Sequence, residues 1–216
     1  MLIEIYQPGR LGDIIYVMAI AQRLQANGHK VIFPIHEKYK NIAPHFPDIN
    51  FVSSEEKIQK PRFILPLWYG KQIDKNPDNL MTNKYKMYNL NLSGNGILDP
   101  CNDWRKVKFK RFQEKEDKLF KEKVKTKRYI LRNERSNSGK IEIPIKTDLE
   151  IVDMDMSGSL IDWSKIIENA EEIHTVHTSL IYLVDLLKTT TKLFIYKRNA
   201  ENVKVSHLLQ KRWKEI

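Results

Sequence analysis

The chain has 216 residues, 41% of them hydrophobic and 30% charged, with a net charge of +10. This composition fits one large or two small globular domains and excludes a chain dominated by disorder. The single cysteine, Cys101, cannot form an internal disulfide, no Cys/His spacing suggests zinc, and no apolar run reaches the ~20 residues of a membrane span. We therefore expect a cytoplasmic protein with no transmembrane segment and no secretory signal.

The first part of the sequence alternates strands with helices. Apolar runs predict strands at 2–6, 30–35, 49–54 and 62–69. A helix is predicted over 13–26, and Asn27-Gly28 is a typical helix stop. Its apolar positions recur at spacings of three and four: Ile14, Val17, Met18, Ala21 and Leu24. A short helix interrupted by Pro44 is predicted at 39–46. This order predicts a twisted parallel sheet with right-handed crossovers.

Residues 70–104 are polar and rich in Pro and Gly, which predicts a loop-rich domain edge with at most a helix near 79–89. A charged helix is expected near 112–125.

A second alternation starts near Tyr129. Predicted strands cover 128–134, 149–155, 172–178 and 192–197. Predicted helices cover 160–170, 179–189 and 200–213. We therefore predict an α/β protein with two Rossmann-like lobes, residues 1–104 and 105–216, facing a central cleft, with the final helix returning to the first lobe.

Positive charge is concentrated in residues 105–128, which hold 12 Lys/Arg against 4 Asp/Glu. One interpretation is a surface for a phosphate-bearing partner, which could be nucleic acid, an anionic membrane face or a nucleotide. The other is a solvated helix whose lysines are balanced by nearby acids. Lys-rich usage without aromatic interleaving does not specify a nucleic-acid reader.

The motif Gly9-Arg10-Leu11-Gly12-Asp13 joins the first predicted strand to the first helix. Gly9 and Gly12 allow a tight turn and close approach of a ligand, with Arg10 between them. Asp13 is either a helix cap or, at the cleft end of the strand, a general base. The spacing is not the G-x-G-x-x-G of dinucleotide-binding proteins. Since Asn also caps weakly, Asp13→Asn is expected to cost about 1 kcal/mol or less.

A second motif, His177-Thr178-Ser179, lies where a predicted strand meets a Leu-rich helix. Hydroxyls and free amides at a helix N-terminus suit a diphosphate, although the same residues also serve as ordinary caps. The loop 131–140 places Arg132, Arg135, Ser136 and Lys140 at another strand end, either as a surface hairpin or as a basic phosphate site.

These two motifs resemble those of heptosyltransferase-like glycosyltransferases. "GRLGDIIYVMAIAQRL" is similar to the family's opening Gly-x-Leu-Gly-Asp and helix, and "TVHTSLIYLVDLL" to its C-terminal donor motif. The resemblance covers about 60 residues well and implies a two-lobed GT-B glycosyltransferase, here a compact, viral or phage-type member. The chain departs from the pattern at His177, where the family has Asp, and lacks the usual Pro near Met18.

The resemblance implies roles for individual residues. Asp13 matches the catalytic base, Thr178, Ser179 and Tyr182 match positions around the donor diphosphate, and an N-terminal acceptor lobe precedes a C-terminal donor lobe. Arg132, Arg135, Ser136 and Lys140 would then help to neutralise the leaving group, with no metal and no cofactor, since the nucleotide sugar is a substrate.

The expected reaction transfers a sugar from a nucleotide-sugar donor to a hydroxyl of a glycan or lipid-linked acceptor. Two alternatives remain open at this point. The acceptor could be nucleic acid, bound through residues 105–128, or the chain could be a non-catalytic nucleotide-binding protein.

Overall fold

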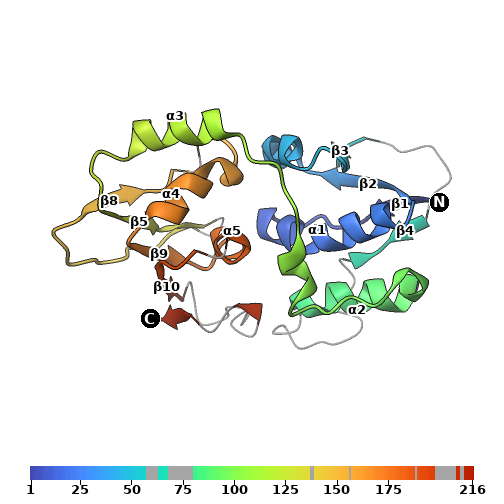
Figure 1. The fold of residues 1–216 in the computed structure, drawn as a ribbon. Coiled ribbons are helices and arrows are strands. Elements are labelled where there is room, and N and C mark those ends of the chain that lie inside the picture. Colours follow the sequence, from blue (N-terminus) through green and yellow to red (C-terminus); the bar gives the residue numbers. More distant parts are fainter. Residues whose placement is uncertain are drawn as a thin grey trace. The chain divides into compact units, whose positions relative to one another are not determined.

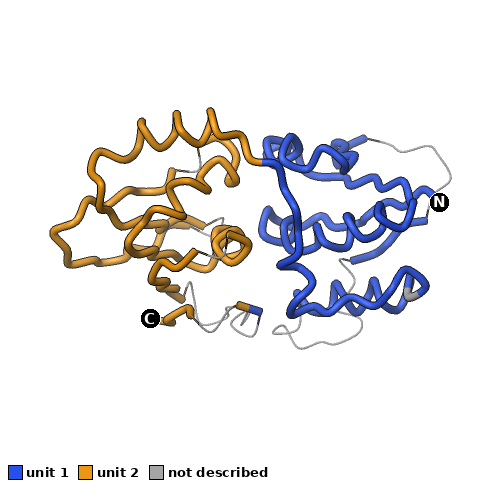
Figure 2. Tube along the Cα trace, viewed as in Figure 1, with its two compact units in different colours: residues 1–110, 203–208 blue, residues 111–202, 209–216 orange. Residues whose placement is uncertain are grey.

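A computed structural model describes residues 1–56, 63–67, 80–136, 139–155, 157–187, 189–197, 208–209 and 212–216. The chain divides into two compact units (Figure 2). Unit 1 comprises residues 1–110 and 203–208, and unit 2 comprises residues 111–202 and 209–216. The chain passes from unit 1 to unit 2 after Lys110, whereas the sequence analysis placed the boundary after residue 104.

Unit 1 contains a four-stranded sheet in the order β3-β2-β1-β4 (Figure 1). The strands are β1 (Leu2–Ile5), β2 (Lys30–Ile35), β3 (Asn50–Ser53) and β4 (Phe63–Leu65). All pairings are parallel, with Ile3 opposite both Val31 and Phe63. The parallel sheet predicted for this part of the chain is confirmed.

Helix α1 (Leu11–Ala26) begins two residues before its predicted start. The five apolar positions that predicted it are all buried. Asn27 is its C-cap, and Gly28 follows with φ +80°, a conformation that favours glycine. The predicted helix stop is therefore confirmed.

Helix α2 (Leu80–Leu92) is longer and better packed than predicted. It runs beside α1 (Figure 1), and the Tyr85 hydroxyl donates to the Tyr16 carbonyl at 2.8 Å. Its buried apolar face recurs at helical spacing: Met81, Tyr85, Tyr88 and Leu92. The helix predicted near 79–89 is confirmed and ends three residues later than predicted, because the polar composition hid part of its apolar stripe.

The described residues of unit 1 also form the 3₁₀ helices η1 (Glu37–His45), η4 (Ser93–Asn95) and η5 (Asp103–Lys106). The η5 residue Trp104 is fully buried, and its ring lies 5.7 Å from that of Tyr16.

Unit 2 contains a five-stranded parallel sheet in the order β11-β10-β9-β5-β8. The strands are β5 (Tyr129–Asn133), β8 (Glu150–Asp153), β9 (Glu172–Val176), β10 (Lys192–Tyr196) and β11 (Trp213–Glu215). A separate antiparallel hairpin joins β6 (Arg135–Ser136) to β7 (Gly139–Lys140). The predicted hairpin in the loop 131–140 is therefore present.

The helices of unit 2 are α3 (Gln113–Lys123), η6 (Leu160–Trp163), α4 (Ser164–Asn169) and α5 (Leu180–Leu187). The helix predicted at 160–170 is thus a 3₁₀ turn followed by a short α-helix. Residues 200–207, 210 and 211 of the predicted final helix lie outside the described residues. At Trp213 that prediction is wrong, because Trp213 begins strand β11 and pairs with Leu193 of β10. The Trp213 indole N–H also donates to Asp185 at 2.8 Å.

Both sheets are built outward from their first strand. After β1 the chain adds β2 and β3 on one side and then β4 on the other. After β5 it adds β8 on one side and then β9 on the other. Such a change of direction opens a crevice at the carboxyl ends of the strands, where α/β proteins bind ligands. The prediction of an α/β protein with parallel sheets is confirmed.

Candidate functional site

Asp13 lies at the carboxyl edge of the unit 1 sheet, as the third residue of α1. Its Oδ2 accepts a hydrogen bond from the Arg10 backbone N–H at 2.9 Å. The carboxylate therefore caps the start of α1, which is one of the two roles that the sequence suggested for Asp13. Its side chain is also 19% exposed, so capping does not remove it from solvent.

The other carboxylate oxygen faces a buried lysine. Lys84, on α2, is completely inaccessible to solvent, and its Nζ lies 3.2 Å from Asp13 Oδ1. Lys84 Nζ also donates to Gln7 Oε1 at 2.9 Å. Burial lowers the pKa of Lys84, and the neighbouring Asp13 carboxylate opposes that effect without cancelling it. The two carboxylate oxygens are thus bound from two different elements.

Sequence reasoning missed Lys84, although a signal was present. Lys84 follows Met81 by three residues and precedes Tyr88 by four, so it lies on the apolar face of α2. A lysine on a buried face requires a partner, because an unpaired buried ammonium is costly. The partner came from a different part of the chain, which the helical pattern alone does not identify.

Gly9 fits closely against the site. A Cβ at this position would lie 2.2 Å from Gln7 Nε2 and 2.7 Å from Asp13 Oδ2, both closer than real contacts. A larger residue at this turn would therefore have to displace the side chain of Gln7 or Asp13. Gly12 lies in the first turn of α1 and is partly exposed, and the Arg10 backbone serves as the N-cap. The structure thus brings Gly9, Arg10 and Asp13 together as the motif predicted.

In unit 2, Asn133 connects the two strands that border the change of direction. It ends β5 and is 1% exposed. Its Nδ2 donates to Thr175 Oγ1 and to Thr178 Oγ1, each at 3.0 Å. Its Oδ1 accepts from the Arg135 backbone N–H at 3.3 Å. A polar residue at the end of an apolar strand was the available signal for Asn133, which the sequence analysis did not single out.

Thr178 lies two residues before α5 and caps its first N–H group. Its Oγ1 accepts from the Leu180 N–H at 3.3 Å, in addition to the bond from Asn133. Ser179 is partly exposed, whereas Tyr182 is 6% exposed within α5. Thr178 and Ser179 therefore occupy the strand-to-helix turn as predicted, whereas the Tyr182 side chain is buried.

The predicted basic residues of the 131–140 loop are largely engaged by acids. Glu134, 7% exposed, accepts from the Ile143 N–H at 2.8 Å and lies 3.0 Å from Lys140 Nζ. Arg132 forms two hydrogen bonds to Asp153, at 2.7 and 3.0 Å. Burial raises the pKa of Glu134, but these neighbours outweigh it and the net pKa is lowered.

Arg135 and Ser136 belong to the hairpin. The Ser136 hydroxyl donates to the Gly139 carbonyl at 3.1 Å. Arg135 is exposed, and within the described part of the chain no acid is paired with its guanidinium. Of the four basic-loop residues predicted to contact a donor, Arg135 is the one whose charge stays available to an anion.

Many charges of residues 105–128 are balanced within their own unit. Arg111 binds Glu116 and Glu168, and Lys123 binds Asp155. Arg128 likewise binds Glu171 at 2.9 Å. These pairs favour the solvated-helix interpretation over a dedicated phosphate surface.

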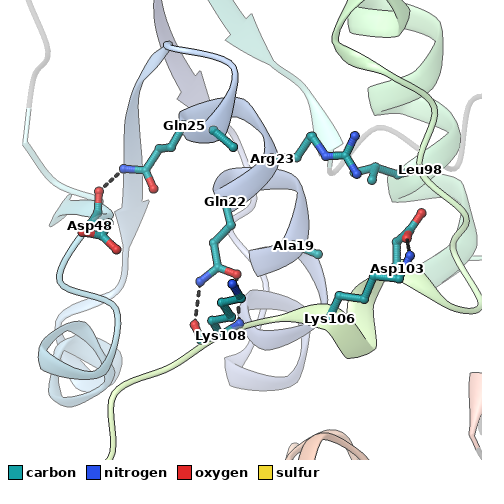
Figure 3. Close-up of a pocket in the computed structure, with 10 residues that line it drawn as sticks. Ala19, Gln22, Arg23, Gln25, Asp48, Leu98, Asp103, Lys106 and Lys108 are labelled. Carbon is teal, nitrogen blue, oxygen red and sulfur yellow. Dashed lines mark hydrogen bonds and ion pairs between the residues drawn. The ribbon is translucent and has the colours of Figure 1, made fainter.

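A hollow of about 760 Å³ lies along the later turns of α1 in unit 1 (Figure 3). Gln22 exchanges two hydrogen bonds with the Lys108 backbone, and Lys106 binds Asp103 at 2.6 Å. Asp13 and Lys84 do not line it. Because Gln22, Gln25 and Lys106 are already bound to other residues of the lining, we assign the hollow no ligand.

No group of three His, Cys, Asp or Glu side chains in the described ranges is arranged to hold a metal ion. None of the helices that the structure describes has the length and apolar character needed to cross a bilayer.

Comparison with known proteins gives matches in structure but not in sequence. No family model matches the chain, and no curated protein does so. An Escherichia coli ADP-heptose lipopolysaccharide heptosyltransferase II superposes with a TM-score of 0.61 at 10% identity, over 100% of this chain and 90% of that one. A glycosyl transferase of family 9 from Veillonella parvula gives 0.59 at 10% identity, over 100% and 86%.

The fold is of the GT-B type. A third similar structure, the Escherichia coli heptosyltransferase WaaC with ADP-2-deoxy-2-fluoro heptose, gives a TM-score of 0.55 at 9% identity, over 100% of this chain and 93% of that one. At such low sequence identity, the structural similarity establishes a shared fold only. Activity has to be argued from the residues themselves.

Proposed function

We propose that the protein is a glycosyltransferase that moves a sugar from a nucleotide-sugar donor to a hydroxyl of a glycan or lipid-linked acceptor. One observation carries the proposal: in a GT-B fold, a partly exposed carboxylate, Asp13, is held at the carboxyl edge of the first sheet where the strand order changes direction. That location suits a general base facing a ligand.

In the proposed reaction, Asp13 accepts the proton of the acceptor hydroxyl as that oxygen attacks the anomeric carbon. The bond from this carbon to the diphosphate oxygen breaks, and its electron pair leaves with the nucleoside diphosphate. A well-placed general base contributes roughly 10²–10⁴-fold to such a step. The geometry of Asp13 supports this role, because hydrogen bonds and the Lys84 ion pair fix its carboxylate while leaving it 19% exposed.

The donor diphosphate is assigned to unit 2, at the turn from β9 into α5. The amides at the start of α5, the Thr178 and Ser179 hydroxyls and the exposed Arg135 provide donors and positive charge. Asn133 supports this turn by binding Thr178. Arg132 and Lys140 contribute less than the sequence suggested, because acids already balance them.

Further features of the proposal come from the sequence and stay predictions: independence of metal and of a cofactor, a cytoplasmic location and a viral or phage-type origin. Two of the similar structures are heptosyltransferases in complex with ADP-linked heptoses, so ADP-heptose is the first donor to test. No observation favours nucleic acid as the acceptor.

The proposal is tested by turnover. Purified protein is incubated with a panel of nucleotide sugars that includes ADP-heptose, and release of nucleoside diphosphate is measured. We expect turnover with at least one donor and a loss of at least 10²-fold in Asp13→Asn. Absence of turnover with every donor would leave the non-catalytic interpretation in place.

Asp13→Asn needs a matched background because it leaves Lys84 buried without its carboxylate. We therefore compare Asp13→Asn/Lys84→Met with Lys84→Met, in which no buried charge is stranded. Loss of rate in the double variant then reports loss of the base rather than loss of folding. A double variant that keeps most of the wild-type rate would make Asp13 a cap and not a base.

The donor site is tested by calorimetry with ADP. Thr178→Val together with Ser179→Val should weaken binding about tenfold, since two hydroxyl donors are lost. Thr190→Val, an exposed threonine of the same unit, is the control. Unchanged affinity in the double variant would place the diphosphate elsewhere.

A further inference from the structure

Lys84 is a fully buried ammonium in a helix whose other core positions are largely apolar. We propose that Lys84 is the positioning residue of Asp13, fixing the carboxylate in the orientation needed to accept the acceptor's proton. This inference rests on the proposed function, because it assigns Lys84 a role in that reaction.

The contacts describe how the positioning works. The Arg10 N–H binds Oδ2 of Asp13 from the start of α1, and Lys84 binds Oδ1 from α2. These two contacts, from different elements, together fix the rotation of the carboxylate plane. A single capping hydrogen bond would leave that rotation free. The absence of a side chain at Gly9 leaves room for the carboxylate in this position, since an added Cβ would lie 2.7 Å from Asp13 Oδ2.

Lys84 is itself anchored to the sheet. Gln7 lies two residues after the end of β1, is 2% exposed, and accepts from Lys84 Nζ at 2.9 Å. The line from β1 through Gln7 and Lys84 to Asp13 therefore connects the carboxylate to the rigid centre of unit 1. A side chain held by a buried partner on a helix keeps its geometry more precisely than one placed by a loop alone.

Stability alone does not account for a lysine here. Replacing buried ion pairs with well-packed apolar residues is often neutral or stabilising, so methionine would serve packing as well. The charge instead gives the carboxylate a fixed counterpart. Misplacement of a reacting group by about 1 Å can cost about 10²-fold in rate, which sets the scale of the effect expected on losing Lys84.

The test is a double-variant cycle in kcat. Wild type, Lys84→Met, Asp13→Asn and the double variant are assayed with ADP-heptose, or with the nucleotide sugar that gave the highest turnover in the panel. We expect Lys84→Met to lower kcat at least tenfold with the donor KM changed less than threefold. In the Asp13→Asn background the same substitution should lower kcat no further, since Lys84 acts through Asp13.

Lys86→Met is the matched control, because Lys86 is an exposed lysine two residues along the same helix. It should retain the wild-type kcat. Melting temperatures are recorded for every variant, and Lys84→Gln replaces Lys84→Met in the cycle if the methionine variant does not fold.

The outcomes separate the two proposals. If Asp13→Asn/Lys84→Met keeps most of the wild-type rate, the proposed base is wrong, and the role of Lys84 fails with it. If Asp13→Asn abolishes turnover while Lys84→Met retains the wild-type kcat, only the inference about Lys84 fails. A loss from Lys84→Met that is equally large in both backgrounds would show that Lys84 acts on folding or elsewhere, and would also overturn the inference.

Discussion

Two charged clusters, one in each unit, place opposite charges inside the protein. In unit 1 the cation is buried: Lys84 is fully enclosed and its partner Asp13 is 19% exposed. In unit 2 the anion is buried: Glu134 is 7% exposed, whereas its partner Lys140 is 63% exposed. Both clusters lie just beyond the carboxyl ends of parallel strands, after β1 and after β5.

The difference lies in what remains when one partner is removed. Loss of Asp13 leaves an ammonium that no water reaches, whereas loss of Glu134 leaves cations that can turn to solvent. The cost of breaking an ion pair depends chiefly on the partner left behind. The four predictions below test this comparison, beginning with the largest effect.

Asp13→Asn should lower the free energy of unfolding by about 3–5 kcal/mol, or about 10 °C in melting temperature, because it strands Lys84. This replaces the expectation of about 1 kcal/mol or less that capping alone gave. Adding Lys84→Met should restore most of the lost stability. Thermal unfolding of the four proteins measures this, and a double variant as unstable as Asp13→Asn would contradict it.

Glu134→Gln should cost about 1–2 kcal/mol, less than Asp13→Asn. Its amide oxygen can still accept from the Ile143 N–H, and Lys140 and Arg132 can move toward water. Urea unfolding of both variants under one set of conditions gives the ranking. A larger loss for Glu134→Gln than for Asp13→Asn would reverse the proposed asymmetry.

The titration of Lys84 should make stability depend on pH. Burial lowers the pKa of Lys84 in the folded state, while the unfolded lysine titrates near ~10.4. Between these two values the unfolded state binds more protons, so stability rises with pH. The difference in unfolding free energy between wild type and Lys84→Met should therefore change in favour of wild type from pH 7 to pH 10. Lys86→Met should track wild type throughout, and an identical slope in Lys84→Met would refute the assignment.

Lys140→Met should have the smallest effect, about 0.5 kcal/mol. Lys140 is 63% exposed, and Glu134 keeps its hydrogen bond from Ile143 and its proximity to Arg132. Because this pair is near the surface, the effect should also diminish at 1 M salt. A loss above about 2 kcal/mol would show that Glu134 depends on Lys140 as strongly as Lys84 depends on Asp13.

Local sequence patterns predicted most of the secondary structure. The strands at 30–35, 172–178 and 192–197 and the helix at 13–26 were found close to their observed bounds, since apolar periodicity reports which face of an element is buried. The pattern was weakest where a polar composition masked the apolar stripe of α2, and it was wrong at Trp213, whose strand forms only by pairing with β10.

The sequence by itself determined that Asp13 follows a glycine turn at a strand-to-helix junction, because a turn and a helix start depend on residues adjacent in the chain. The tertiary structure alone decided that Lys84, 71 positions further along the chain, is the partner of Asp13, and that Asn133 joins β5 to the turn at Thr178. Neither pairing follows from periodicity, since both depend on which strands become neighbours in the sheets. Burial then fixes their energetic weight: a charge such as Lys84 looks ordinary in a sequence and becomes costly once water is excluded from it.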